Sequence, residues 1–182
     1  MDKEMKRKAI LNDALLPILI KTSIPTIIGM LVMVIYNLTD TFFVGILNNK
    51  SMTAAIGIVF SFMSFIQALG FWFGYGSGNI MSKKIGEQNE DEAKNLASIG
   101  IFFAISAGLI IALLSLIFTI PLSKFLGGSA SDDLLKFTVK YLQIIILSIP
   151  FGLYSLTVYN QLRLCGNVKE GMTGLLFGMI TN

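Results

Sequence analysis

Asp40 is the residue whose type and position most directly suggest chemistry. It is an acid inside an apolar run, between Leu38 and the segment Phe42-Phe43-Val44. A carboxylate at the centre of a bilayer costs about 2.5–3.5 kcal/mol on insertion scales, and this cost favours the protonated acid. A carboxyl group at this depth, whose charged form is costly, could bind and release a proton or coordinate Na⁺ through its oxygens. The alternative is that Asp40 only caps the outer end of its helix at the membrane interface.

Asp40 also belongs to a set of residues at helical spacing. Steps of three and four residues place six positions on one helix face, with Asn37 beside them: Thr22, Thr26, Gly29, Met33, Tyr36 and Asp40. Hydroxyls, a thioether, a phenol and an acid suit a bundle interior or a wet cavity better than lipid. Met33 and Tyr36 could contact apolar cations, because thioethers adapt their packing and aromatic rings offer cation–π contacts. Ordinary packing is the alternative for both residues.

Pro25 lies in the middle of the same apolar run. Proline removes one backbone hydrogen bond and clashes with the preceding helical turn, so the sequence predicts a kink there. The kink could serve as a hinge. The alternative is a static bend that neighbouring helices accommodate.

Gln67 and Asn160 are candidates for a cavity inside the bundle. Gln67 continues a polar stripe with Ser61 and Ser64, for which cavity lining and interhelical hydrogen bonding are both open. Asn160 lies near the end of a later apolar run, and we expect it to face the bundle.

Glycines at four-residue spacing precede a basic segment. Gly70, Gly74 and Gly78 form a small-residue stripe, which predicts close approach of another helix. They do not predict a phosphate-binding loop, because no strand precedes them and no Lys-Ser or Lys-Thr pair follows.

The composition places these residues in a membrane. Of 182 residues, 54% are hydrophobic and 14% are charged, and the mean hydropathy is +0.73. A soluble domain carries about 25% charged residues, so these values exclude a soluble globular protein and a disordered chain. Histidine is absent, and Cys165 is the single cysteine. These counts exclude a histidine triad, a histidine metal site, a disulfide within the chain and a cysteine zinc cluster.

Charged residues divide the sequence into apolar spans. A helix needs about 20 apolar residues to cross the hydrocarbon core, and four spans fit, at about 15–40, 52–80, 95–119 and 135–160. Residues 171–182 form only half a span. A chain is not expected to stop inside lipid, because its last carbonyl groups would lack partners. We therefore expect an N-terminal fragment of a longer protein.

Local signals predict the helix boundaries. Asn89 and Glu92 form a capping box that should begin the third span. Ser131 and the acids after it should begin the fourth span, and Pro121 should end the third. Of the 14 Lys and Arg residues, ten fall on the side of the N-terminus and four on the other side. This distribution predicts a cytoplasmic N-terminus.

Several segments, in their order and spacing, resemble the N-terminal part of a multidrug and toxic compound extrusion (MATE) transporter. Residues 36–45 (YNLTDTFFVG) are similar to the family's D-x-x-F-V-G segment, and residues 82–89 (SKKIGEQN) to its S-R-x-x-G-x-x-N segment. Residues 160–167 (NQLRLCGN) resemble the end of the fourth span and the loop after it. The resemblance covers essentially the whole chain.

This resemblance implies a fold and a set of roles. Family members have twelve helices in two six-helix lobes, of which this chain would hold about four and a half helices of the N-lobe. They exchange H⁺ or Na⁺ for organic, often cationic, compounds by alternating access. By position, Asp40 matches the ion-coupling acid and Pro25 the bending proline. Asn160 matches a polar residue near that acid, and Asn182 matches the asparagine of an N-x-x-x-D segment in the fifth helix.

The sequence therefore predicts an all-α, polytopic membrane protein that acts in ion-coupled multidrug efflux and is not an enzyme. The expected location is the plasma membrane. Asp40 is the predicted ion-coupling residue and Pro25 the hinge, and the predicted cavity and ion-site neighbours are Met33, Tyr36, Asn37, Gln67, Asn160 and Asn182.

No cofactor is expected beyond the coupling ion, and no metal beyond Na⁺ at Asp40. The expected partners are small organic cations, the lipid bilayer and the C-terminal lobe of the same chain, but not nucleic acid. Two alternatives remain open. A flippase of the same superfamily would move lipid-linked oligosaccharides and would be expected to carry more basic residues in its cavity. A small four-span scaffold protein would end near Asn182.

Overall fold

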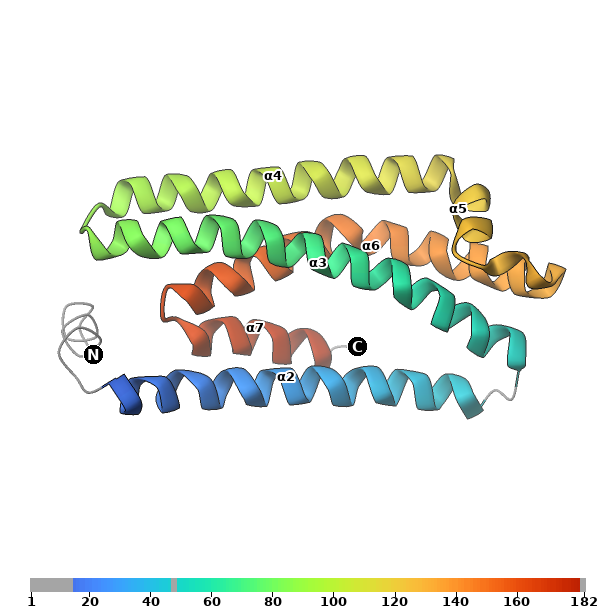
Figure 1. The fold of residues 1–182 in the computed structure, drawn as a ribbon, viewed down its shortest axis with the longest axis horizontal. Coiled ribbons are helices and arrows are strands. Elements are labelled where there is room, and N and C mark those ends of the chain that lie inside the picture. The colour runs from blue at the N-terminus through green and yellow to red at the C-terminus, as the bar shows by residue number, and fades with distance from the viewer. Residues whose placement is uncertain (1–14, 47–48, 181–182) are drawn as a thin grey trace.

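The computed structural model describes residues 15–46 and 49–180, and within these ranges almost every residue is helical (Figure 1). The elements are α2 (Leu15–Ile46), α3 (Lys50–Gly86), α4 (Glu90–Ile117), α5 (Thr119–Phe125), the 3₁₀ helix η1 (Gly128–Ala130), α6 (Asp132–Leu164) and α7 (Val168–Ile180). No strand occurs in the described part of the chain. The predicted all-α fold class is therefore confirmed.

Three of the described helices are long and apolar enough to cross a membrane: α3, α4 and α6. Helix α2 has 32 residues, which corresponds to about 48 Å at 1.5 Å per residue. The helices overlap the predicted spans, but α3 and α6 extend several residues beyond them at both ends. These extensions carry charged residues such as Lys84 and Asp132, which water can solvate outside the hydrocarbon core.

The predicted N-cap residues Asn89 and Ser131 are confirmed, but the reciprocal bond of the capping box is not formed, because the Asn89 backbone N–H donates to the Lys84 carbonyl. Asn89 Oδ1 accepts a hydrogen bond from the Glu92 backbone N–H at 3.1 Å, and Asn89 Nδ2 donates to Glu92 Oε2 at 2.8 Å. Lys84 Nζ lies 3.0 Å from the same Glu92 oxygen and 3.1 Å from Glu87 Oε2. Ser131 Oγ accepts from the Leu134 backbone N–H at 3.2 Å and begins α6.

The predicted end of the third span is wrong in one respect. Helix α4 ends at Ile117, and Pro121 lies in the first turn of the short helix α5. Proline is tolerated in a first turn, because the N–H groups there have no partner within the helix. Thr119 Oγ1 donates to the carbonyl oxygens of Ser115 and Leu116, both at 2.8 Å. The hydroxyl therefore satisfies carbonyls at the end of α4, and the chain turns before the proline.

Helix α2 continues through Pro25 without interruption. Figure 1 shows it as a straight ribbon, so the kink predicted at Pro25 is absent from this conformation. Gly29, four residues later, is buried against side chains of α6 and α7. This packing holds the next turn of α2 along its neighbours and opposes a bend.

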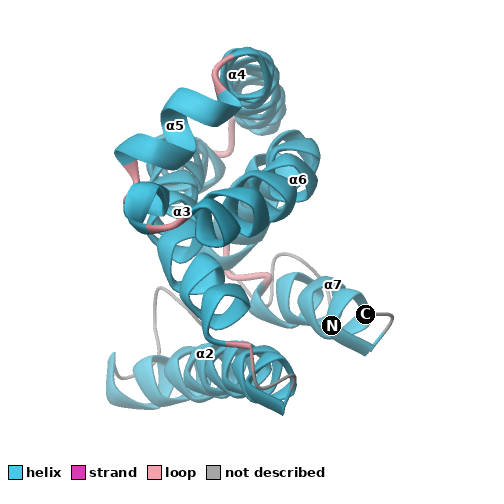
Figure 2. Cartoon of the chain, turned by 90° about the vertical axis from the view of Figure 1, so that its right-hand side faces the viewer, coloured by secondary structure: helices cyan, strands magenta, loops and turns pink. Residues whose placement is uncertain are grey.

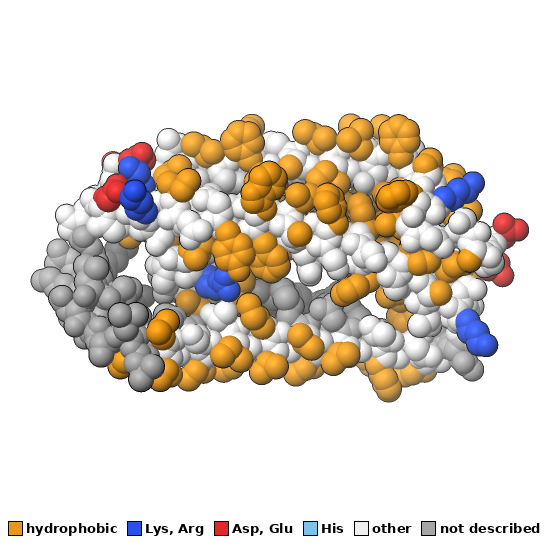
Figure 3. Space-filling view, in the orientation of Figure 1, with side chains coloured by type: hydrophobic (Ala, Val, Ile, Leu, Met, Phe, Trp, Pro, Cys, Tyr) orange, Lys and Arg blue, Asp and Glu red, His pale blue; other side chains and the backbone are white. Residues whose placement is uncertain are grey.

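The helices form two groups. Helices α3, α4 and α6 pack around a common core whose fully buried members include Val59, Ala104, Leu142, Ile146 and Leu153. Helices α2 and α7 lie side by side, apart from α4 (Figure 2). Figure 3 shows hydrophobic side chains along the length of the bundle and charged side chains mostly at its two ends. The long sides of the bundle are therefore suited to lipid.

The predicted glycine stripe packs helix α3 against helix α6. A Cβ atom on Gly74 would lie 2.7 Å from Asn160 Cβ and 3.2 Å from the Thr157 Cα atom. Contacts below 3.0 Å essentially never occur for a real Cβ atom, so only glycine allows this approach. Gly70 and Gly78 face Leu156 and Leu164 of α6 in the same way. Packing, as predicted, is the role of this stripe.

We expect Gly74→Ala to destabilise the protein. The added methyl group must push α6 away from α3, and such overpacking costs about 1–3 kcal/mol. The thermal unfolding midpoint of the purified protein measures the change. Gly76→Ala is the matched control, because a Cβ atom there meets no described atom within 4 Å. Equal midpoints for both variants would contradict the assigned packing.

Candidate functional site

The predicted site residues of α2 are only partly described. Met33, Tyr36, Asn37 and Asp40 lie within the helix, but their side chains, like that of Pro25, fall outside the described residues. Asn182 also lies outside the described residues. Their predicted roles stay predictions.

The helical register shows which face of α2 carries position 40. Gly29 is buried, and Thr26 and Val44 are half-buried. By contrast, Leu31, Val34 and Leu38 on the opposite side of the helix are more than half exposed. At about 100° per residue, position 40 falls between positions 29 and 44 around the helix axis. Position 40 therefore lies on the less exposed face of α2, which Gly29 shares.

Tyr159 of α6 connects this face of α2 to α7. Its side chain is buried. A Cβ atom on Gly29 would lie 3.8 Å from the Tyr159 hydroxyl oxygen, and one on Gly171 would lie 3.2 Å from Tyr159 Cδ2. Tyr159 is not among the residues predicted from the sequence. The signal that could have found Tyr159 is the pair of glycines on the two neighbouring helices.

Asn160 is fully buried at the contact of α6 with α3. The prediction that it faces the bundle is confirmed. Its Nδ2 donates to the Leu156 carbonyl at 2.7 Å, but its Oδ1 has no hydrogen-bond partner among the described residues. The Thr157 hydroxyl, one turn earlier, is also buried without a partner there. An unsatisfied buried polar group costs about 1–3 kcal/mol, so both oxygens are available to accept a proton donor or to coordinate a cation.

Gln161 joins three helices beside this position. Its Nε2 donates to Ser77 Oγ of α3 at 2.9 Å and to the Ala97 carbonyl of α4 at 3.2 Å. Ser77 Oγ donates in turn to the Phe73 carbonyl at 2.7 Å. The side chain of Gln161 is nearly inaccessible. The arrangement fixes α6 against both partners next to Asn160.

Gln67 is not brought to Asn160. It is half-buried on α3 and makes no hydrogen bond among the described residues. It precedes Gly74, which faces Asn160, by seven residues, or about 10 Å along the helix. This distance separates Gln67 from Asn160, and its predicted place beside Asp40 stays a prediction.

An apolar cleft lies between α2 and α3. Its volume is about 450 Å³, and residues of both helices line it: Val34, Leu38, Thr41, Val44, Thr53, Ile56, Gly57 and Phe60. Small-molecule sites commonly measure about 300–1,000 Å³. Leu38 and Thr41 flank position 40 in the sequence, so the cleft lies at the same level along α2 as the predicted ion-coupling position, although at about 100° per residue these two residues lie on other faces of the helix. Within the described residues, no group of three His, Cys, Asp or Glu side chains could hold a metal ion.

The sequence matches one protein-family model, described as MatE, over residues 25–182. It is 31% identical over 154 residues to the multidrug export protein MepA of Staphylococcus aureus (strain NCTC 8325 / PS 47), covering 85% of this chain and 34% of that protein. It is 32% identical to MepA of Staphylococcus haemolyticus (strain JCSC1435), with the same coverage. The chain thus spans about a third of the length of these curated relatives.

Solved structures share the fold. An outward-facing multidrug resistance transporter of the MATE family and the MOP superfamily superposes with a TM-score of 0.82 at 24% identity, covering 89% of this chain and 35% of that one. A MOP superfamily transporter from Pyrococcus furiosus Vc1 (DSM3638), described as having a binding pocket of reverse polarity, gives a TM-score of 0.81 at 24% identity, with the same coverage. The arrangement of α2 to α7 is therefore that of known transporters.

We expect Gln161→Leu to destabilise the bundle by about 1–3 kcal/mol, because Ser77 Oγ and the Ala97 carbonyl lose their shared donor. The thermal midpoint of the purified protein measures the loss. Gln143→Leu is the matched control, since Gln143 is exposed on the same helix. If both glutamine variants unfold at the same temperature, the three-helix contact does not contribute to stability.

Proposed function

This chain belongs to the MatE family, and from that premise we propose that it forms part of an ion-coupled exporter of organic compounds. The observation that carries the proposal is the combination of two features. An apolar cleft between α2 and α3 lies at the level of position 40 along α2, and Asn160 of α6 offers a buried carbonyl oxygen with no hydrogen-bond partner among the described residues. One feature fits an organic molecule and the other fits a coupling ion.

We propose Asp40 as the coupling carboxylate. Position 40 lies on the face of α2 that also carries the buried Gly29. A deprotonated carboxyl group could coordinate a Na⁺ ion through its oxygens. A protonated carboxyl group could instead donate a hydrogen bond to a polar partner. Either ion would neutralise the acid and change its interactions with polar partners and with a cationic substrate.

The available driving force is adequate for export. One proton moving inward across about 100 mV releases about 2.3 kcal/mol, and one pH unit adds about 1.4 kcal/mol. The sum of about 3.7 kcal/mol supports a roughly 500-fold gradient of a neutral compound. A monovalent cation exchanged for one proton carries the same charge, so only the pH difference remains, which gives about tenfold.

The straight helix α2 is proposed as one end of a conformational cycle. Two solved MATE structures that resemble this chain are described as straight and bent, with TM-scores of 0.81 and 0.80. Another is a MATE mutant in which alanine replaces a proline. We propose that loss of polar contacts at Asp40 lets α2 bend at Pro25, which changes the shape of the cleft next to α3 and releases the substrate.

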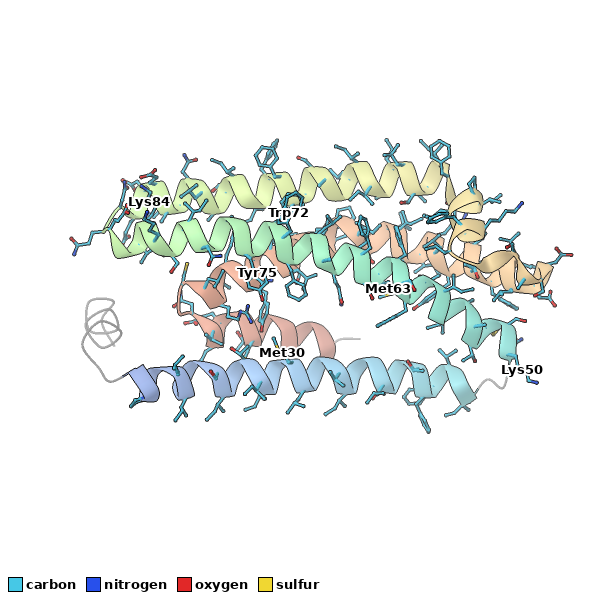
Figure 4. All side chains as sticks on the ribbon, viewed as in Figure 1. Met30, Lys50, Met63, Trp72, Tyr75 and Lys84 are labelled. Atoms are coloured by element: carbon cyan, nitrogen blue, oxygen red, sulfur yellow. The ribbon has the colours of Figure 1, made fainter. Side chains whose placement is uncertain are left out.

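We also propose the orientation and location. The α3–α4 and α6–α7 connections lie at one end of the bundle, which we call the Lys84 end (Figure 4). The start of α3 and helix α5 lie at the other end, which we call the Lys50 end. The positive-inside rule, applied to the whole sequence, supports a cytoplasmic Lys84 end. The N-terminus would then lie in the cytoplasm. We propose the plasma membrane as the location.

The Asp40→Asn variant tests the coupling. Asparagine cannot ionise, so we expect ion-driven efflux to fall to the level measured without a gradient. The measurement is efflux of a fluorescent organic cation from vesicles that contain the full gene product, with proton and Na⁺ gradients imposed separately. Asp133→Asn is the control, because Asp133 is exposed in the first turn of α6. Full efflux by Asp40→Asn would refute the proposal.

Cys165 tests the orientation. It follows α6 at the Lys84 end and is half-buried. We expect a membrane-impermeant maleimide to modify it in inside-out vesicles but not in intact cells. Burial raises the pKa of the Cys165 thiol, so its reaction should be slow at neutral pH and accelerate as the pH rises.

Ser129→Cys in a Cys165→Ser background provides the opposite control, because Ser129 is exposed at the Lys50 end. Labelling of Cys165 from outside the cell, together with labelling of the control only from inside, would invert the proposed orientation.

A further inference from the structure

Arg163 at the end of α6 has an unusual environment for a cation. It lies in the last turn of the helix and is half-buried. Its Nη2 donates a hydrogen bond to the Tyr75 hydroxyl of α3, and its Cζ lies 5.2 Å from the centre of the Tyr75 ring. A guanidinium group has five N–H donors in a rigid plane. The contact with Tyr75 fixes the group but uses few of these donors.

Arg163 has no carboxylate partner in the described part of the chain. The ion pairs found there join Lys83, Lys84 and Lys94 to acids of the α3–α4 turn. Arg163 takes part in none of them. Its positive charge and its remaining donors are therefore available to an anion, and planar two-point binding of phosphate is the interaction that arginine favours.

Aromatic residues place Arg163 at the level of lipid headgroups. Tyr75 stacks on Phe71 with ring centres 5.8 Å apart, and the neighbouring Trp72 is 70% exposed. Tryptophan and tyrosine concentrate where the hydrocarbon core meets water. Lys84 follows Tyr75 by nine residues, or about 13 Å along α3. The Lys84 end therefore projects into water, whereas Tyr75 lies about 7 Å before the predicted end of its span at residue 80 and Arg163 lies three residues beyond the predicted end of its own span at residue 160.

The surroundings of the pair are open and apolar. Figure 4 shows Tyr75 pointing from α3 toward α7 and α2. Lys169, in the first turn of α7, adds a second exposed positive charge near the same connection, and Glu170 follows it. A ligand for this place needs an anionic head and apolar tails.

We propose that Arg163 and Tyr75 bind the phosphate group of an anionic phospholipid in the membrane leaflet at the Lys84 end. The guanidinium group donates to two phosphate oxygens, while Tyr75 holds its plane and leaves its outer edge free. The acyl chains lie along the apolar surface of α3. A bound lipid then links the ends of α3 and α6. This site depends only on the placement of the chain in a membrane, not on the proposed export activity.

Lipid titration of the purified full gene product, followed by native mass spectrometry, tests this site. The probes are phosphatidylglycerol and phosphatidylcholine. One basic residue near a membrane surface contributes about 1 kcal/mol, so Arg163→Gln should weaken the first phosphatidylglycerol bound about fivefold. Binding of phosphatidylcholine should be unchanged. Lys94→Gln is the control, because Lys94 is exposed at the same end but pairs with Asp91, and it should bind both lipids as the unmodified protein does.

Further variants keep the test decisive if Arg163→Gln does not fold. Arg163→Lys keeps the charge and loses the planar fork, and Tyr75→Phe keeps the ring and loses the hydroxyl that positions Arg163. Each should weaken phosphatidylglycerol binding by about twofold to threefold. Unchanged binding in the variants that fold would overturn the proposal. Displacement of phosphatidylglycerol by millimolar inorganic phosphate would also overturn the lipid assignment, because the site would then bind a free anion.

Discussion

The close approach of α3 and α6 is the constraint on which the rest of the structure depends. Lipid tails are as apolar as the helix surfaces, so burial of apolar side chains does not drive helices together inside a membrane. Small residues replace that force with close packing and short polar contacts. Gly74 allows Asn160 to reach the interior of the bundle. Gln161, the next residue, then reaches Ser77 and the Ala97 carbonyl and adds α4 to the pair.

The second group of helices is attached differently. Helices α2 and α7 meet the others partly through Tyr159, which lies against Gly29 and Gly171. Between α2 and α3 the chain leaves an apolar cleft of about 450 Å³ instead of a glycine seam. Movement of α2 relative to α3 would therefore break few close contacts. This difference in packing supports a closely packed unit of three helices next to a pair that can change position.

Features that depend on only a few neighbouring residues could be predicted from the sequence. The four-residue glycine spacing and the Asn89 cap describe contacts that the local helical geometry determines. Tyr159 could not be identified in this way, because its importance comes from glycines on two other helices. The straight course of α2 through Pro25 also depends on neighbours, since Gly29 packs against α6 and α7 just after the proline. Gln67 has a polar side chain that would suit a cavity, but it precedes Gly74, which faces Asn160, by seven residues of α3.

In the proposed mechanism, Asp40 exchanges its ion for substrate within this group of helices. The most direct measurement is ion release when an organic cation is added to the purified full gene product, with a pH indicator for protons and a selective electrode for Na⁺. Thermodynamic linkage requires that competing ligands displace one another. We expect release of about one ion per bound cation from the unmodified protein and none from Asp40→Asn. Equal release from both proteins would show that Asp40 does not hold the exchanged ion.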